Sequence, residues 1–190
     1  GCFSKEAYAF IDWLKEAGQT YWQILPIHPT SYGDSPYQSF STFAGNPYFI
    51  DLEELIEEGM LTREECDSMD FGDDEDDIDY EDQYQNRYIL LTMAYERSNI
   101  SQNPDYQRFV EENRWWLDDY ALFMALKTFF NGQCWNEWPQ DIRLRWGYSM
   151  DYYRRELYFD IEFQMFLQFY FFRQYWRLKA YANENHIKII

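Results

Sequence analysis

Strand-like and helix-like segments alternate along this chain, and the alternation limits the folds it can adopt. Short β-prone stretches at Thr20–Pro26, Tyr48–Ile50 and His186–Ile190 are separated by segments with helical periodicity. Strands that alternate with helices predict an α/β fold with a parallel sheet. The last stretch is apolar and β-branched, and no segment follows it to turn the chain back. We therefore expect a sheet that is unfinished within these 190 residues.

Local signals predict where the helices begin and end. Ser4 can cap a helix, and Gly18 stands where a helix C-terminus favours a left-handed residue. Thr62–Glu65 has the pattern of a capping box. The expected helices cover 4–17, 52–58, 82–98, 105–112, 115–130 and 152–183, with a loop at 28–47 and an irregular stretch at 134–150.

Charge and hydropathy exclude two classes of partner. The net charge of −18 disfavours nucleic acid, which needs a basic surface. No apolar run approaches the roughly 20 residues of a membrane helix. The most apolar stretch, 163–176, is interrupted by Gln164, Gln168, Arg173 and Gln174. We expect neither a nucleic-acid nor a membrane partner.

Cysteine usage indicates a reducing compartment. The three cysteines are far apart in the sequence, and there are only two histidines, so neither a disulfide framework nor a zinc site is expected. This favours the cytoplasm, with no metal and no cofactor. The run Glu64–Asp82 holds twelve acids and no base, as a solvated acidic loop would. Calcium binding at Asp73–Asp77 is the alternative, and the segment lacks the Gly and the closing Glu of an EF-hand.

Aromatic residues are abundant, at 22% of the chain. Most aromatic side chains fill cores, and that is the simplest interpretation for most of these. Aromatic rings also form flat platforms for the apolar faces of sugars. The composition is therefore compatible with carbohydrate binding but does not establish it.

The loop at 28–47 carries the most specific sequence pattern. It contains Ser31–Ser41 (SYGDSPYQSFS) followed by Ala44–Pro47 (AGNP). With Gln19–Pro26 before it and collinear matches further along, this pattern resembles the first active-site loop of amylomaltases, the 4-alpha-glucanotransferases of glycoside hydrolase family 77. The further matches are 51–55, 137–139 with 143–145, and 171–174 with 178–183.

The resemblance implies the N-terminal portion of a (β/α)8 TIM barrel, with about three strands and an inserted, mainly helical subdomain. Residues 1–58 would begin the catalytic barrel with strands one and two. Residues 59–150 would form the insertion, which includes the acidic loop 64–82. Residues 151–190 would supply a long helix and the third strand. Active sites of such barrels lie at the C-terminal ends of the strands, and loop 28–47 follows strand one.

The resemblance also implies retaining transfer of α-1,4-glucan segments to a glucose or glucan acceptor. That chemistry needs two carboxylates about 5–5.5 Å apart, one as nucleophile and one as acid/base. In the family these residues lie on later strands, so we expect them beyond Ile190 and expect the 190-residue chain alone to be inactive. Its contribution would be the binding of maltodextrin or another α-1,4-glucan.

The resemblance assigns substrate contacts to several residues of the loop. Tyr37 would lie beside the sugar at the cleavage point, Ser35 would contact the neighbouring sugar, and Tyr32 would form an outer aromatic platform. Gln38 could bind sugar hydroxyls or brace the loop. Asp34 is the nearest carboxylate, although a turn-forming role before Ser-Pro is the simpler interpretation.

Two further residues, Tyr80 and His28, have alternative interpretations. Tyr80 could complete the outer platform from the insertion or could simply pack in the core. His28 is interpreted as structural, because a lone loop histidine rarely performs catalysis by itself.

Two rival functions remain at this point. One is a non-catalytic α-glucan-binding module that uses the same loop. The other is an interaction protein built on the helices of 82–183, which leaves loop 28–47 unexplained. Three strands of a barrel would leave an open sheet edge, so self-association of the chain is also possible.

Overall fold

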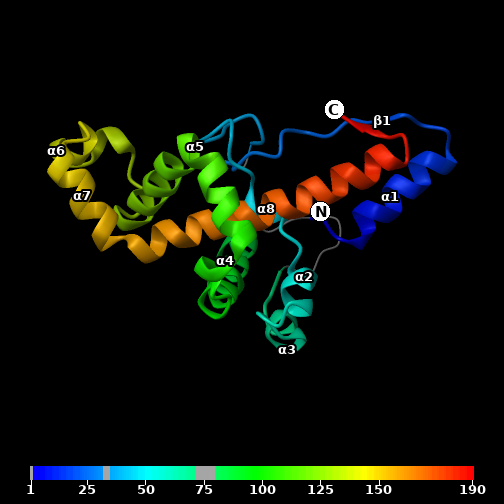
Figure 1. The fold of residues 1–190 in the computed structure, drawn as a ribbon, viewed down its shortest axis with the longest axis horizontal. Helices are drawn as coiled ribbons and strands as arrows, with labels where there is room; N and C mark the ends of the chain where they lie inside the picture. The colour runs from blue at the N-terminus through cyan, green and yellow to red at the C-terminus, as the bar shows by residue number, and fades with distance from the viewer. Residues whose placement is uncertain (1, 32–34, 72–79) are drawn as a thin grey trace. The chain divides into compact units, whose positions relative to one another are not determined.

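The computed structural model describes residues 2–31, 35–71 and 80–190, with the side chains of 80–83 left aside. Figure 1 shows a chain made mainly of helices. The helices are α1 (Lys5–Glu16), α2 (Leu52–Glu57), α3 (Arg63–Asp67), α4 (Tyr80–Arg97), α5 (Pro104–Phe129), α6 (Gln140–Arg143), α7 (Gly147–Glu156) and α8 (Tyr158–Glu184), with 3-10 turns η1 (Pro47–Phe49), η2 (Ile100–Gln102) and η3 (Trp135–Glu137). The strands are β1 (Tyr21–Trp22) and β2 (Lys188–Ile189).

The chain forms two compact units. One contains Gly1–Ile100 and Gln168–Ile190, and the other contains Ser101–Leu167. These bounds differ from the expected division at residues 58 and 150. The assignment of barrel and insertion therefore stays a prediction.

The two strands pair directly and in parallel. Tyr21 lies opposite Lys188 and Trp22 opposite Ile189. The ladder continues where the Ile190 amide donates to the Trp22 carbonyl at 3.0 Å and the Ile24 amide donates to the Ile190 carbonyl at 2.8 Å. The predicted strands at 20–26 and 186–190 are thus real but shorter than expected. Within the described residues they form a two-stranded sheet, which does not by itself establish a barrel.

The predicted strand at Tyr48–Ile50 is wrong, because these residues lie in and after the 3-10 turn η1. Pro47 opens the turn, and the Asn46 side chain caps it by accepting from the Tyr48 amide at 3.0 Å. The backbone finds partners outside any sheet. The Phe3 amide donates to the Phe49 carbonyl at 2.9 Å, and Arg87 of α4 donates to the Ile50 carbonyl at 2.6 Å. The strand at 186–190 consequently lies next to the first strand.

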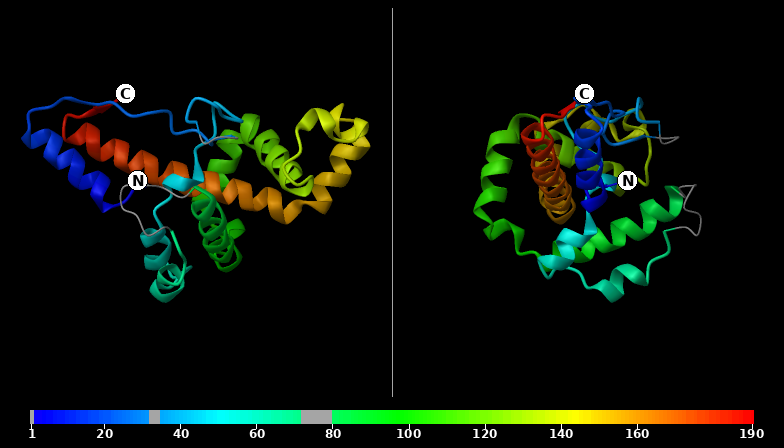
Figure 2. Two further views of the ribbon diagram at one scale, coloured as in Figure 1. Left: turned by 180° about the vertical axis from the view of Figure 1, so that it is seen from behind. Right: turned by 90° about the vertical axis from the view of Figure 1, so that its right-hand side faces the viewer.

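Helix α1 and the C-terminal part of α8 lie side by side, as both views of Figure 2 show. The rings of Tyr8 and Tyr181 are 5.1 Å apart, and the Tyr181 hydroxyl donates to Asp12 at 2.6 Å. Lys15 donates to the Asn185 side chain at 2.8 Å. These contacts fix two helices beside the strand pair, as expected for an α/β arrangement.

Two of the predicted helix boundaries fail for reasons that lie in side-chain contacts. The predicted helices 105–112 and 115–130 form one helix, α5, in which the side-chain amide of Asn113 donates to the Phe109 carbonyl at 2.8 Å and its oxygen accepts from the Trp116 indole at 3.0 Å. Conversely, the single helix expected over 152–183 is broken at Leu157, whose side chain is buried in the core of the second unit. The stretch 134–150, expected to be irregular, contains η3, α6 and the start of α7.

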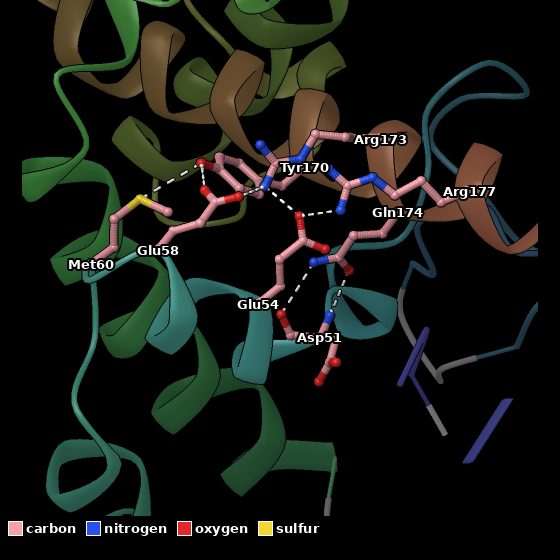
Figure 3. A network of polar contacts seen from close by, with 8 residues as sticks. All are labelled: Asp51, Glu54, Glu58, Met60, Tyr170, Arg173, Gln174 and Arg177. Atoms are coloured by element: carbon pink, nitrogen blue, oxygen red, sulfur yellow. Dashed lines mark hydrogen bonds and ion pairs between the residues drawn. The ribbon is translucent and has the colours of Figure 1, made fainter. Parts of the chain in front are cut away.

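An ion-pair network joins α2 to α8 in the first unit, as Figure 3 shows. Arg173 pairs with Glu54 and with Glu58, and Arg177 contacts Glu54 at 2.9 Å. The Tyr170 hydroxyl donates to Glu58 at 2.9 Å, and the Arg173 guanidinium lies 4.2 Å from the Tyr170 ring centroid. Side chains of Arg173 and Glu54 are only 19% and 17% exposed, so water screens this pair weakly.

We predict that Arg173→Met lowers the free energy of unfolding by about 2 kcal/mol, because two partly buried carboxylates lose a charged hydrogen-bond partner. Arg63→Met is the matched control, since Arg63 also pairs with a glutamate of α2, Glu53, but both side chains are about half exposed. That change should cost less than about 1 kcal/mol. Urea denaturation of both variants provides the comparison, and equal losses would contradict the role assigned to Arg173.

None of the helices in the described part of the chain is long and apolar enough to cross a membrane.

Candidate functional site

The two ends of loop 28–47 are fastened to each other. The Asn46 amide donates to the Ile27 carbonyl at 2.9 Å. Nδ1 of His28 lies 3.1 Å from the Ala44 carbonyl oxygen, to which an N–H at that position donates. Ala44 and Asn46 are buried. The structural role expected of His28 fits this contact, which holds the base of the loop closed.

The described part of the loop tip folds back on itself. Thr30 and Ser39 form an isolated antiparallel bridge, and the Ser31 amide donates to the Gln38 carbonyl at 3.0 Å. The Gln38 amide donates to the Ser35 carbonyl at 3.0 Å, which closes a turn over 35–38. Backbone bonds therefore fix this turn, and the side chains on it are available for other contacts.

Three of the predicted site residues lie together on this turn. Tyr37 is 75% exposed, and Gln38 is also exposed. Ser35 is half-buried, and its hydroxyl accepts from the Tyr37 amide at 3.4 Å. Tyr32 and Asp34 lie outside the described residues, as does the possible calcium segment 73–77. Tyr80 begins α4, but its side chain also lies outside the described part.

A cavity of about 870 Å³ opens at the C-terminal end of β1. The chain after β1, residues 24–27, lines it together with Thr30 and Pro36 of the loop. Phe3, Tyr175 and Leu178 also contribute, so the lining is mostly apolar. Ser35, Tyr37 and Gln38 are not among the lining residues. The turn thus borders the cavity through Pro36, and the three predicted side chains lie outside the lining.

Two buried glutamines of α8 hold the end of loop 28–47 and the segment just after it, and their role was not predicted from the sequence. The Gly45 amide donates to Oε1 of Gln168 at 2.8 Å, and Nε2 of Gln168 donates to the Gly45 carbonyl at 3.0 Å. Gln174 makes the same pair of bonds with Asp51, at 2.7 and 3.2 Å, and is drawn in Figure 3. Each side-chain amide thus satisfies one residue's N–H and C=O, as a neighbouring strand would.

Gly45 also lies directly against the ring of Phe171, which stands between the two glutamines on α8. A Cβ atom at Gly45 would overlap the Phe171 ring. A signal for these anchors was present in the sequence, because Gln168 and Gln174 interrupt an otherwise apolar helix. Polar residues that are buried must find partners, and here the partners are backbone groups.

Among the described residues, three carboxylates near the site make structural contacts. Asp51 caps α2 by accepting from the Glu53 amide at 3.3 Å, and burial raises the pKa of its carboxyl. Glu54 and Glu58 share Arg173. Among the side chains of residues 2–31, 35–71 and 84–190, no three His, Cys, Asp or Glu gather as a metal site would require.

Ligands of α/β proteins bind beyond the carboxyl ends of parallel strands, and the pinned loop stands at that end of β1. The fold of the first unit is thus a parallel strand pair flanked by helices. A family model described as 4-alpha-glucanotransferase, glycoside hydrolase family 77, matches residues 1–190. The chain belongs to this family.

Individual relatives agree with this assignment. The chain is 48% identical to the 4-alpha-glucanotransferase of Clostridium butyricum over 190 residues, which are all of this chain and 39% of that protein. It is 43% identical to the Thermus thermophilus enzyme over 194 residues, again all of this chain and 38% of that protein. The chain therefore spans less than two-fifths of the length of these relatives.

A solved structure agrees in fold. The amylomaltase from Streptococcus agalactiae, solved in complex with acarbose, matches with a TM-score of 0.92 and 36% identity. The match covers all of this chain and 39% of that one. The predicted family is thus confirmed, whereas the roles assigned to the loop residues remain predictions.

Proposed function

We propose that this chain forms the glucan-binding N-terminal part of an enzyme that transfers segments of α-1,4-glucan to a glucose or glucan acceptor by retaining double displacement. The observation that carries the proposal is the fixed turn at 35–38, which exposes Tyr37 on a loop whose base is closed, in a chain that belongs to the 4-alpha-glucanotransferases. The expected cytoplasmic location belongs to the same proposal.

In this proposal the loop holds the sugar, and other residues break the glycosidic bond. The exposed Tyr37 ring offers an apolar face for stacking on a pyranose ring. Ser35 and Gln38 offer a hydroxyl and an amide to sugar hydroxyls. Tyr32, Asp34 and Tyr80 are included in the site on the strength of the family resemblance alone.

The nucleophile and the acid/base are proposed to lie outside these 190 residues. Catalysis needs a carboxylate pair with one member free to attack and the other free to exchange a proton. Glu54 and Glu58, two carboxylates of the first unit, are both bound to Arg173. We therefore expect the chain alone to bind maltotriose without converting it to glucose and longer products.

We predict that Tyr37→Ala weakens maltotriose binding to the chain about tenfold, because loss of a stacking ring is worth roughly 1–3 kcal/mol by analogy with ring stacking elsewhere. Phe43→Ala is the matched control, since Phe43 is an aromatic residue of the same loop with 51% exposure and has no assigned sugar contact. Isothermal titration calorimetry with maltotriose measures both affinities.

The same samples separate the rival functions. The proposal is supported if the 190-residue chain binds maltotriose without converting it and if the same residues, within a full-length family enzyme, take part in glucan transfer. Transfer by the 190 residues alone would refute the assignment of the carboxylates. An unchanged maltotriose affinity in Tyr37→Ala would refute the sugar contact assigned to loop 28–47. A non-catalytic binding module is favoured if the full-length natural protein also fails to transfer. Gel filtration of the chain tests the proposed self-association.

A further inference from the structure

The second unit, residues 101–167, has a pocket of its own. Its volume is about 320 Å³, and its walls come from α5, η3, α6 and the start of α7. Small-molecule sites begin at about 300 Å³, so the pocket is large enough for a ligand of one or two sugar rings. All of its lining residues lie within this unit.

The floor of the pocket is the apolar core of the unit. Leu122, Leu126, Trp138, Ile142 and Met150 are all buried and pack in one cluster. The Trp138 indole donates to the Gln133 carbonyl at 3.2 Å, so its polar atom has a partner. The floor therefore offers a rigid apolar surface with fixed side chains.

Trp135 forms a wall of the pocket and remains 54% exposed. It lies in η3, and the core cluster of the unit does not include it. Half of a large indole in contact with water is unfavourable for the chain alone, because burial of apolar surface is worth about 25 cal/mol per Å². A ligand that covered this face would recover that free energy.

Charged side chains stand at the rim. Arg145 donates to Asp119 at 2.6 Å, and both side chains are more than half exposed. Arg143 is held by a bond from its guanidinium to the Asn136 carbonyl at 2.8 Å. Planar carboxylate and guanidinium groups can each bind two neighbouring hydroxyls, and these three surround the mouth of an apolar pocket.

This combination selects one chemical class of ligand. Asp119 and Arg145 pair with each other and Arg143 binds a backbone carbonyl, so a wholly apolar ligand would cover these polar groups without offering them any hydrogen bond. An anion could contact Arg143 and Arg145, but it would lie beside the Asp119 carboxylate in a chain with a net charge of −18. A neutral pyranose has one apolar face for the indole and a ring of hydroxyls for the rim. We propose that the pocket at Trp135 is a second glucan-binding site, separate from loop 28–47.

The choice of an α-1,4-glucan as the sugar rests on the proposed function, whereas the existence of the pocket does not. A second point of attachment on the same chain raises the effective concentration of a long glucan at the first point, if the geometry allows both to be engaged. This gain in effective concentration therefore applies to long glucans. Maltotriose is too short to gain from it and reports binding at each site separately.

The test labels the whole chain with 5-fluorotryptophan and follows the fluorine NMR signals as maltotriose is added. Single tryptophan variants assign the signals of Trp135 and Trp115. We expect the Trp135 signal to shift with saturation, and we expect Tyr37→Ala to leave that shift unchanged. Trp115, which is 69% exposed on α5 and does not line the pocket, should not respond.

Variants then measure the contribution of the ring. In the Tyr37→Ala background, Trp135→Ala should weaken the remaining maltotriose binding at least tenfold, and Trp115→Ala should not change it. Asp119→Asn should weaken it several-fold. The melting temperature serves as the check on folding, and it should change little because Trp135 and Asp119 are both about half exposed.

The outcomes distinguish this site from the loop. The Trp135 signal could stay fixed up to about 50 mM maltotriose, which is well above a millimolar dissociation constant. That result would overturn the proposed site at Trp135 and would not bear on the binding role of loop 28–47. A saturating shift of the Trp135 signal that Asp119→Asn weakens, with no effect of Tyr37→Ala on maltotriose binding, would support the site at Trp135 and refute the sugar contacts assigned to loop 28–47. Equal shifts of the Trp115 and Trp135 signals would show non-specific contact with maltotriose and would overturn the proposed site at Trp135.

Discussion

Gly45→Ala is expected to lower the free energy of unfolding by about 3 kcal/mol, because a methyl group at this position has no space. The added Cβ would overlap three atoms of the Phe171 ring. That ring is 1% exposed and is held by Phe3 and Tyr175, at centroid distances of 5.2 and 6.1 Å. It cannot move aside without opening the core. Urea denaturation followed by circular dichroism measures the change.

The chain supplies a matched control for this substitution. Gly147 is the first residue of α7, and a Cβ there would meet no atom within 4 Å. Gly147→Ala should therefore be neutral or stabilising by up to about 1 kcal/mol, since alanine favours helix. The double change Gly45→Ala with Phe171→Leu should recover part of the loss by removing the ring. Equal stability of Gly45→Ala and the parent would contradict the close approach.

Several predictions that rest on a few neighbouring residues agree with the structure, although Ser4 stands at the N-cap of α1 without a side-chain capping bond. Gly18 and Gly59 have φ of 70° and 75°, as expected where helices end. The capping box at Thr62 and Glu65 is present with both of its bonds. The turn that groups Ser35, Tyr37 and Gln38 also follows from local residues, because Ser and Pro favour turns. Short-range chemistry fixes each of these features.

Predictions fail where distant residues decide the outcome. The segment at 48–50 has β-prone residues, yet its backbone groups bind Phe3 and Arg87, and no strand forms there. Leu157 breaks a helix that local propensity would continue, because its side chain is buried in a core. Gln168 and Gly45 are 123 residues apart in the sequence. No local pattern could pair them, although a polar residue in an apolar helix indicated that some partner was needed.

Substitution of Gln168 is expected to lower the free energy of unfolding as much as substitution of Gly45. For a glutamate at this position the loss should depend on pH. Its side chain is fully buried and both accepts from and donates to the Gly45 backbone. In Gln168→Glu an ionised carboxylate could still accept from the amide, but it would face the Gly45 carbonyl with no proton to donate. A buried charge and an unsatisfied carbonyl together should cost about 3 kcal/mol at pH 7.

Protonation should reverse much of this loss. The buried carboxyl that faces a carbonyl has its pKa raised above the unfolded value of about 4.3, and its neutral form can donate to Gly45. A group whose pKa is raised in the folded state stabilises that state below the unfolded pKa and loses this contribution as the pH rises through the folded pKa. The stability difference between Gln168→Glu and the parent should therefore grow from pH 4 to pH 7.

Two further variants make this expectation specific to the Gly45 contact. Gln168→Leu removes both bonds without adding a titratable group, so its loss should be similar at pH 5 and pH 7. Gln140→Glu places the same new carboxyl at an exposed position in the first turn of α6, where it should change stability by less than about 1 kcal/mol at either pH. If the loss in Gln168→Glu did not change with pH, the side chain would not be donating to the Gly45 carbonyl. Suppose that the stability loss in Gln168→Glu grew with pH and that maltotriose binding fell in parallel. The side-chain amide of Gln168 would then be the group that holds loop 28–47 in the conformation that binds maltotriose.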